Sequence, residues 1–272
     1  MDILHDIGRA LIQLRQQRPL IHHITNFVTM TDCANVTLAV GASPTMTNAV
    51  EEVGEMASAA SALVLNLGTL QSWTIEAMMI AGKAAAKAGI PIVLDPVGVG
   101  GTTFRTTAAL RLLDALPITI VRGNLSEMTC LATRRCGHPI GVDNHATGAI
   151  TPDTAQTIAQ HVQTTVVITG AHDAISDGTQ AVLLGNGTPM LTYVTGTGCM
   201  TTSLIGSFAA VAAPFIAATA GVMTMGIAGE MAVAHGGDAG PGTFHQRLLD
   251  AVYTLDSQRI CSSGKVLMYH EY

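Results

Sequence analysis

Charged residues are scarce in this chain. Lys, Arg, Asp and Glu make up 12% of the 272 residues, about half of the roughly 25% that is usual in globular proteins. The formal net charge is −6, and no basic run extends beyond Arg134-Arg135. We therefore expect no nucleic-acid partner, because binding to phosphate backbones needs a basic surface. So few charges also leave little polar surface to cover a monomer, which favours burial in an oligomer.

Sequence patterns typical of disulfide frameworks and zinc sites are missing as well. The five cysteines are odd in number and contain no CxxC pair, and the ten histidines contain neither HExxH nor HxxxH. His22 and His23 are adjacent, so in a strand their side chains would point to opposite faces. Residues 1–18 have the pattern of an ordinary amphipathic segment rather than a secretory leader. We expect reduced thiols, a cytoplasmic location and no zinc site.

One long stretch has no charge at all. No charged residue occurs between Gly178 and Gly229, and residues 203–229 are apolar enough to be tested as a membrane span. Alanine and glycine dominate this stretch, however, and Pro214 divides it into two pieces that are each short for a bilayer crossing. We predict two buried helices and no membrane partner.

Short apolar runs rich in β-branched residues alternate with helical patterns. The runs cover residues 63–66, 92–95, 118–122 and 166–169, and the helical patterns cover 73–88, 106–116 and 153–163. Continuous apolar runs indicate strands buried on both faces, hence a parallel sheet. The alternation predicts an α/β fold, a three-layer α/β/α sandwich with a mostly parallel central sheet. We expect one domain over residues 1–258, a hairpin at 174–178 and 180–184 followed only by helices, and a tail of unassigned role at 259–272.

Polar residues at the strand ends are the first candidates for a site, because ligands in such folds bind beyond the carboxyl ends of the strands. Asp95 ends one strand and precedes a glycine-rich turn at residues 98–101. Its carboxylate suits a magnesium ion that also holds phosphate oxygens. The alternative is an Asx turn that closes the strand.

A second strand runs into the segment Arg122-Gly123-Asn124-Leu125-Ser126-Glu127. Asn124 is a good N-cap, and Glu127 falls in the first turn of the helix that follows. Glu127 either completes a capping box or faces a metal–phosphate group through water. The Arg122 guanidinium would bind a nucleotide phosphate. Thr169 ends the next strand, where its hydroxyl can bind phosphate or ribose.

The segment Val194-Thr195-Gly196-Thr197-Gly198-Cys199 places two glycines directly before an apolar helix. A helix N-terminus presents unpaired N–H groups and the positive end of the helix dipole, and glycines let an anion approach closely. This phosphate cradle, with the two acids and the strand-end arginine, points to phosphoryl transfer.

Two residues of the N-terminal third are weaker candidates. Met46 follows a turn, and its thioether either packs on an aromatic ring of a ligand or fills the core. Asn26 either lies near a ligand or caps the helix that runs through Thr37.

Taken together, these motifs resemble the hydroxyethylthiazole kinases of the ribokinase-like superfamily. The segments that carry the resemblance occur in the family's order between about residues 21 and 255. They are His23-Ile24-Thr25-Asn26, Gly41-Ala42-Ser43-Pro44-Thr45-Met46, Asn66-Leu67-Gly68-Thr69-Leu70, Leu94-Asp95-Pro96-Val97-Gly98, Arg122-Gly123-Asn124-Leu125-Ser126-Glu127, Val194-Thr195-Gly196-Thr197-Gly198-Cys199 and Gly240-Pro241-Gly242-Thr243-Phe244.

The resemblance implies an activity, cofactors and an assembly. The activity is ATP-dependent phosphorylation of 4-methyl-5-(2-hydroxyethyl)thiazole for thiamine biosynthesis, with Mg²⁺, in a homotrimer whose active sites lie between subunits. The implied site residues are Met46, Asn26 and Gly196 at the thiazole, Arg122, Thr169 and Asn124 at ATP, Asp95 and Glu127 at the metal, and Cys199, Gly196 and Gly198 at the reacting centre.

Cys199 stands where ribokinase relatives usually carry an aspartate that accepts the alcohol proton. A thiol at a helix N-terminus can have a lowered pKa, which would let Cys199 act as the base. Phosphoryl transfer passes through a loose transition state, however, and depends mainly on positioning and charge. We therefore expect the amides of the glycine turn to contribute more than Cys199, which would only pack.

Three other functions fit parts of the pattern. The first is a kinase for another small heteroaromatic alcohol, such as a hydroxymethylpyrimidine. The second is a lyase acting on hydrated nicotinamide nucleotides, although those relatives normally keep the aspartate. The third is a nucleotide-binding protein without turnover, which the missing aspartate would suggest.

Overall fold

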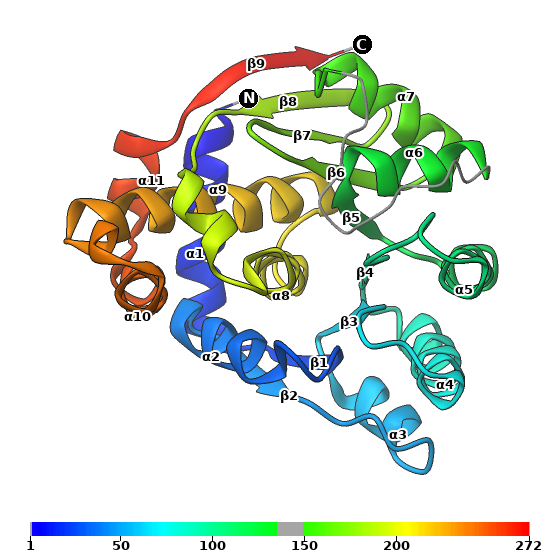
Figure 1. Cartoon of the computed structure of the whole chain (residues 1–272). Helices are drawn as coiled ribbons and strands as arrows, with labels where there is room; N and C mark the ends of the chain where they lie inside the picture. Colours follow the sequence, from blue (N-terminus) through cyan, green and yellow to red (C-terminus); the bar gives the residue numbers. More distant parts are fainter. Residues whose placement is uncertain (1, 135–148, 272) are drawn as a thin grey trace.

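The fold is one twisted sheet with helices on both faces, as the computed structural model of the chain shows (Figure 1). It describes residues 2–134 and 149–271, so Arg135 and Cys136 lie outside the described residues. The strands are β1 Leu20–Ile24, β2 Ser43–Thr45, β3 Ala62–Asn66, β4 Ile92–Asp95, β5 Ile120–Asn124, β6 Thr165–Thr169, β7 Asp173–Ser176, β8 Gln180–Leu184 and β9 Val266–Glu271.

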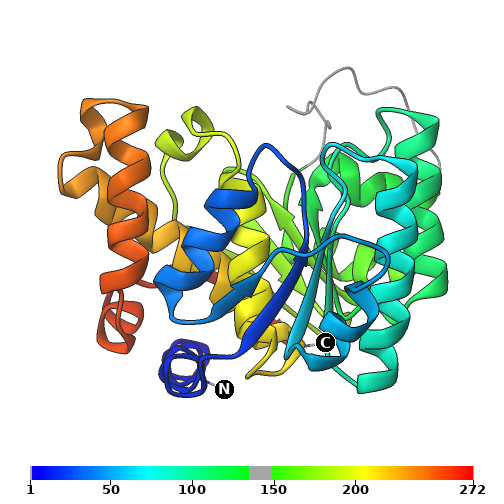
Figure 2. The ribbon, with the colours of Figure 1, turned by 90° about the horizontal axis from the view of Figure 1, so that it is seen from below.

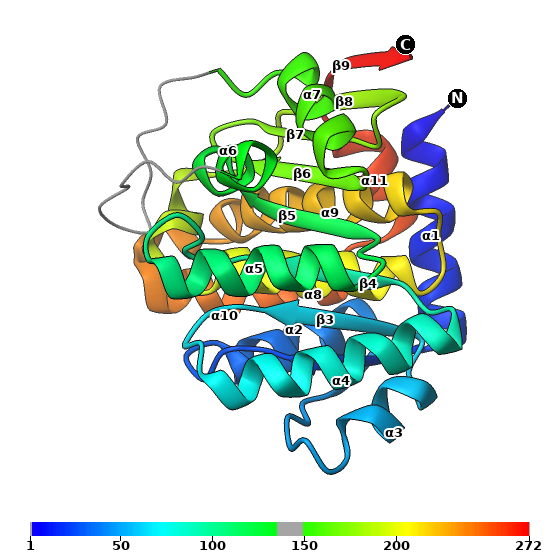
Figure 3. The same cartoon turned by 90° about the vertical axis from the view of Figure 1, so that its right-hand side faces the viewer.

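The helices fall into two layers. The α-helices are α1 Ile3–Gln17, α2 Met30–Val40, α3 Val53–Ala59, α4 Ser72–Ala88, α5 Thr103–Ala115, α6 Leu125–Thr133, α7 Pro152–Val162, α8 Thr197–Ala209, α9 Pro214–Ala234, α10 Pro241–Thr254 and α11 Ser257–Ser263. Two short 3₁₀ helices are also present, η1 Pro189–Tyr193 between β8 and α8 and η2 Gly237–Ala239 between α9 and α10. Figure 3 shows α4 and α5 in front of the parallel strands, with α8, α9 and α10 behind.

The strand order is β2-β1-β3-β4-β5-β6-β7-β8-β9. The pairs from β2 to β6 are parallel, and the three pairs from β6 to β9 are antiparallel. The chain leaves β1 first toward β2 and then returns on its other side to β3, so the topology reverses between β1 and β3. Such a switch point opens a crevice at the carboxyl ends of the strands, where ligands bind.

Each buried strand serves two cores, which explains its continuous apolar run. In β3, Ala62 and Val64 pack into the core shared with α1, α2, α8 and α9, whereas Leu63 and Leu65 pack into the core shared with α3 to α7. Successive side chains of a strand point to opposite faces, so a strand covered on both sides must be apolar at every position. The predictions of a mostly parallel sheet and a three-layer sandwich are confirmed.

Residues 203–229, the apolar end of the uncharged stretch, lie in two helices, as predicted. The break at Pro214 separates α8 from α9, and most residues of both helices are buried. Helix α9 is long and apolar enough to cross a membrane by length and composition. However, 78% of the 18-residue segment that meets this criterion is buried inside the fold. The central helix of a folded domain has the same composition for a different reason, since it contacts protein on nearly all sides.

Two helix ends carry the residues that usually mark them. Thr151 caps α7 with Pro152 in its first turn, and Gly89 ends α4 with a left-handed φ of 70°. The hairpin is present as β7 and β8. The run at residues 118–122 begins as a strand only at Ile120 and continues to Asn124.

The expectation of only helices after the hairpin is wrong. Strand β9 pairs antiparallel with β8 and forms the edge of the sheet, so the last described residues complete the same sheet. Glu230 of α9 anchors this segment, because its carboxylate accepts hydrogen bonds from Lys265 Nζ (2.9 Å) and the Gly187 amide (2.9 Å). Asn186 adds a hydrogen bond to the Ser263 carbonyl (2.9 Å).

Candidate active site

The carboxyl ends of the parallel strands bring the predicted polar residues to one edge of the sheet. Asn66 and Asp95 are paired neighbours at the ends of β3 and β4, and Asn124 and Thr169 are paired at the ends of β5 and β6. Figure 2 shows the loop after β1 and the segment that leads into α8 at the same edge. Residues from six segments of the chain therefore meet here.

Asp95 lies at the centre of this cluster and is 1% exposed. Its Oδ2 accepts hydrogen bonds from Thr202 Oγ1 (2.7 Å) and Asn66 Nδ2 (2.8 Å), and lies 3.9 Å from Arg122 Nη1. Its Oδ1 is buried and has no hydrogen-bond partner among the described residues. Burial raises the pKa of Asp95, and the neighbouring Arg122 charge opposes that rise.

Glu127 is held by backbone amides on both sides. Its Oε2 accepts from the Asn124 amide (2.9 Å) and the Asn124 side chain accepts from the Glu127 amide (2.9 Å), so the two form a capping box. Its Oε1 accepts from the Gly98 amide (2.7 Å) in the turn after β4. Burial raises the pKa of Glu127, and the Asp95 carboxylate adds to the rise. The capping interpretation is confirmed, and it leaves further lone pairs on the carboxylate for water.

Arg122 joins three parts of the site. Its Nη2 donates to Thr169 Oγ1 (2.7 Å), and its Nη1 lies close to Asp95. The guanidinium also lies directly beneath the start of α8, since a Cβ built on Gly198 would be 2.6 Å from Nη1. Only glycine lets the first turn of α8 approach the cation this closely.

The glycine turn lies at the start of α8, as the sequence predicts, but only Gly196 precedes the helix, because α8 begins at Thr197 and Gly198 is its second residue. Gly196 is the N-cap of α8, with φ of 87°, a conformation in which a Cβ is disfavoured. A Cβ on Gly196 would also collide with the side chain of Thr29. No side-chain capping bond is formed at this helix start in residues 2–134 and 149–271, so its first amide groups keep their capacity to donate to a ligand.

Cys199 is partly buried and receives two amide hydrogen bonds. Asn26 Nδ2 and Asn66 Nδ2 each donate to its Sγ at 3.3 Å. Burial raises the pKa of the Cys199 thiol, and the Asp95 charge raises it further. This direction is opposite to the lowering considered for a thiol at a helix N-terminus, and it favours the protonated thiol over the thiolate.

Asn26 is part of the cluster rather than the cap of α2, which begins after Thr29. Its Oδ1 accepts from the Val28 and Thr29 amides at 3.1 and 3.0 Å, and its Nδ2 also donates to Asn66 Oδ1 at 2.9 Å. Met46 lies beyond the end of β2, half-buried, on the other side of β1 from Asn66. The structure therefore brings Asn26 into contact with the residues around Cys199.

Two residues of the cluster were missed from the sequence. Asn66 ends β3 just as Asp95 ends β4. Asp95 was predicted because ligands bind beyond the carboxyl ends of the strands, and the same reason applies to Asn66. Thr202 carries no such signal. It is one of several hydroxyl residues on an apolar helix, and only the docking of α8 shows that it faces Asp95.

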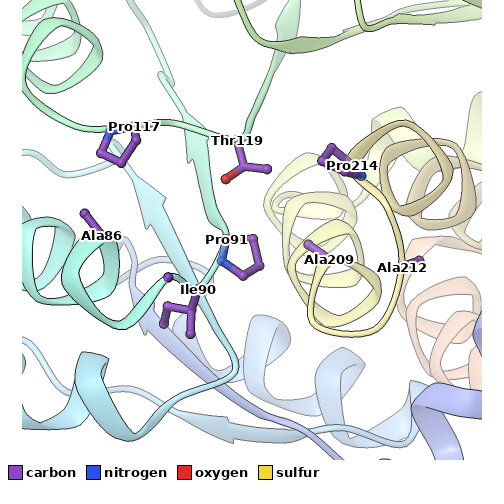
Figure 4. Close-up of a pocket in the computed structure, with 9 residues that line it drawn as sticks. Ala86, Ile90, Pro91, Pro117, Thr119, Ala209, Ala212 and Pro214 are labelled. Atoms are coloured by element: carbon purple, nitrogen blue, oxygen red, sulfur yellow. The ribbon is translucent and has the colours of Figure 1, made fainter.

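A cavity at the opposite edge of the sheet contains none of the predicted site residues. It has a volume of about 390 Å³ and lies where β4 and β5 begin, beside the end of α8 and the start of α9 (Figure 4). Its lining consists of Ala86, Gly89, Ile90, Pro91, Pro117, Thr119, Ala209, Ala212 and Pro214. This lining has no group that titrates or carries charge, so it offers no chemistry for catalysis.

The sequence profile of the hydroxyethylthiazole kinase family matches residues 11–258. This chain belongs to the hydroxyethylthiazole kinase family. A relative named hydroxyethylthiazole kinase from Clostridium beijerinckii is 45% identical over 266 residues, which are 96% of each chain. The solved structure of a hydroxyethylthiazole kinase from Pyrococcus horikoshii is similar with a TM-score of 0.87 and 39% identity, covering 97% of this chain and 99% of that one.

The fold is that of the ribokinase-like superfamily. The structure of a ribokinase-like superfamily protein from Enterococcus faecalis is similar with a TM-score of 0.60, covering 88% of this chain and 87% of that one. Its identity to this chain is 12%, so the similarity concerns the fold alone. The chain is thus a kinase of the hydroxyethylthiazole kinase family with the predicted α/β/α architecture.

Proposed function

We propose that this kinase transfers the γ-phosphoryl group of ATP to the hydroxyl of 4-methyl-5-(2-hydroxyethyl)thiazole, in thiamine biosynthesis, with Mg²⁺ as cofactor. The observation that carries the proposal is the close packing of the α8 start on Arg122 beside Asp95. A helix N-terminus without a side-chain cap, a guanidinium and a carboxylate at one sheet edge are the parts that phosphoryl transfer needs. Relatives named hydroxyethylthiazole kinase support the substrate.

The residues present fit a magnesium ion. Asp95 Oδ1 is a buried carboxylate oxygen without a partner among the described hydrogen bonds, and carboxylate oxygen is the ligand type that Mg²⁺ prefers. Asp95 would hold the ion directly, and Glu127 would do so through water because backbone amides already occupy both its oxygens. When bound, Mg²⁺ supplies positive charge to the phosphate oxygens.

ATP phosphates would lie between the start of α8 and the end of β5. The Arg122 guanidinium and the first amides of α8 donate to phosphate oxygens, and the Arg122 bond to Thr169 fixes the orientation of that donor. Asn124 keeps the α6 start in place through its capping box, so its part in binding ATP is to hold the strand end.

The alcohol would approach from the side of Asn26 and Cys199, with Met46 and Gly196 framing the thiazole ring. Its oxygen forms a bond to the γ-phosphorus while the bond to the ADP oxygen breaks. The protonated Cys199 thiol packs against the reactants. The alcohol proton passes to an oxygen of the transferred phosphoryl group as the new bond forms, and from there to solvent. A loose transition state makes little demand for a strong base, so positioned donors carry most of the catalysis.

A homotrimer would bury apolar side chains that a monomer exposes. Phe27 and Val28 follow Asn26 directly and are 52% and 63% exposed. Exposed apolar groups that continue from a site favour a subunit contact at that place. The molar mass in solution, measured by light scattering after size exclusion, tests the trimer, and a monomer at micromolar concentration would contradict it. The location that fits this enzyme is the cytoplasm.

A substrate panel tests the reaction itself. The protein is mixed with ATP, Mg²⁺ and one of three compounds: the thiazole alcohol, a hydroxymethylpyrimidine or a hydrated nicotinamide nucleotide. The proposal predicts the highest kcat/KM with the thiazole alcohol. A higher kcat/KM with the pyrimidine would indicate a kinase for that alcohol, and dehydration of the nucleotide would indicate a lyase. ATP binding without any product would indicate a nucleotide-binding protein without turnover. Each of these results would contradict the proposal.

A further inference from the structure

We infer that Asn66 is a positioning residue that orients the Asp95 carboxylate and the Cys199 thiol together. The inference rests on the proposed function, in which Asp95 holds the metal and Cys199 lies beside the alcohol. Asn66 is the last residue of β3 and is 2% exposed. It stands between β1 and β4, at the point where the topology of the sheet reverses.

The side-chain amide of Asn66 uses its full hydrogen-bonding capacity. Its Nδ2 donates to Asp95 Oδ2 (2.8 Å) and to Cys199 Sγ (3.3 Å), and its Oδ1 accepts from Asn26 Nδ2 and the Gly68 amide (both 2.9 Å). An amide has two donors and two acceptor lone pairs, and all four are engaged here. A buried amide with four partners has a single orientation, because any rotation leaves polar groups unpaired.

For Asp95, this orientation decides which carboxylate oxygen is available. Asn66 and Thr202 both donate to Oδ2, so Oδ1 is the atom left without a described partner. Without the Asn66 donor, Thr202 is the remaining hydrogen-bond donor described for Oδ2, with Arg122 Nη1 3.9 Å away, so the carboxylate is held less firmly against rotation about its Cβ–Cγ bond. Groups that hydrogen-bond to metal-binding carboxylates commonly change metal affinity or activity by about 10–100-fold when removed.

For Cys199, Asn66 supplies one of two matched donors. Asn26 and Asn66 reach the same Sγ from neighbouring strand ends, and Asn26 is itself held by Asn66 Oδ1. The thiol proton must therefore point away from both amides. Through these bonds Asn66 connects the substrate side of the site, at Asn26, to the metal side, at Asp95.

A purely local role is the competing interpretation. The bond from the Gly68 amide to Asn66 Oδ1 closes the turn after β3, and a residue that does only this would be structural. The two roles use different halves of the amide. The turn needs the acceptor Oδ1, whereas the orientation of Asp95 and Cys199 needs the donor Nδ2.

The variants Asn66→Asp and Asn66→Leu separate these halves. Aspartate keeps an acceptor for the turn but has no donor for Asp95 or Cys199. Leucine has neither the acceptor nor the donors, and it adds no charge. The positioning role predicts that kcat falls by about 10–100-fold in both variants, with a much smaller change in KM for the thiazole alcohol. Thermal unfolding of each variant shows whether the fold is kept, and Asn66→Asp decides alone if Asn66→Leu does not fold.

A second readout does not depend on turnover. Alkylation of Cys199 is followed against pH by mass spectrometry of its peptide, in the parent and in the variants. Loss of the Asn66 donor destabilises the thiolate, so the pH profile of the uncharged Asn66→Leu variant should move to higher pH. In Asn66→Asp the added carboxylate charge raises the thiol pKa as well, so that variant should shift further. A kcat for Asn66→Asp within about threefold of the parent, or an unshifted alkylation profile in a folded variant, would overturn the inference. If the parent phosphorylates the thiazole alcohol equally well without Mg²⁺, the proposed function itself would be contradicted.

Discussion

Replacing Gly198 by alanine is the sharpest perturbation of the phosphate cradle. Gly198 is the second residue of α8, and the new Cβ would lie 2.6 Å from Arg122 Nη1 and 3.1 Å from Nη2. Ordinary contact begins at 3.4 Å, so the guanidinium must move by about 0.8 Å. That movement strains its bond to Thr169 and its approach to Asp95.

The size of the effect follows from this displacement. A shift of about 1 Å in a positioned catalytic group can cost on the order of 10²-fold in rate. We therefore expect kcat/KM for ATP to fall by about 10²-fold in Gly198→Ala. Stability should not fall in parallel, because alanine is the better helix former by about 1 kcal/mol.

Gly242→Ala is the matched control. Gly242 is also the second residue of its helix, α10, but a Cβ built there meets no atom within 4 Å. Both substitutions raise the intrinsic helix propensity by the same amount, but only Gly198→Ala displaces the Arg122 guanidinium. Steady-state rates with varied ATP and thermal unfolding are measured for the parent and both variants. The reasoning is refuted if Gly198→Ala keeps the parental kcat/KM while folded.

Three further predictions concern other residues. Cys199→Ser and Cys199→Ala should keep activity within about tenfold of the parent, because the protonated thiol only packs; complete loss in both folded variants would show that the thiol is essential. Arg122→Lys should raise KM for ATP by at least about tenfold, since an ammonium lacks the planar donor pair that serves Thr169 and a phosphate together; an unchanged KM would remove Arg122 from the ATP site. His23 is buried with a pKa lowered to about 4 by desolvation, so it stays neutral in the native state while the unfolded chain takes up a proton below about pH 6.5. The free energy of unfolding should therefore decrease by up to about 3 kcal/mol as pH falls from 6.5 to 4; denaturant titrations of His23→Leu should show a flatter pH dependence, and an equally steep one would contradict the assignment.

The central strands were predictable because burial on both faces of the sheet requires a continuous run of apolar residues. Strands β3, β4 and β6 are unbroken apolar runs that end in a polar residue. Strand β1 was missed because His22 and His23 interrupt its apolar run, although both side chains are buried. Strand β9 was missed for the opposite reason. It is an edge strand held by backbone pairing with β8, and its side chains are mostly exposed, so no apolar pattern marks it.

The site was predictable where chemistry coincides with a strand end or a helix start. Asp95, Arg122 and the glycine turn were found in this way, and the structure brings them together. The hydrogen bonds that orient them were not predictable, because they depend on how α8 docks on the sheet. Thr202 reaches Asp95 across 107 positions of sequence, and Asn26 reaches Cys199 across 173. No local sequence pattern predicts contacts between residues so far apart in the chain.

The most direct test of the central claim is product analysis with the parent and Asp95→Asn. The protein is incubated with ATP and the thiazole alcohol, with Mg²⁺ or with a chelator, and the thiazole phosphate ester and ADP are quantified together. We expect equal amounts of ester and ADP from the parent with Mg²⁺, almost none with the chelator, and a large loss in Asp95→Asn. ADP without ester, or ester formation that neither the chelator nor Asp95→Asn reduces, would contradict it.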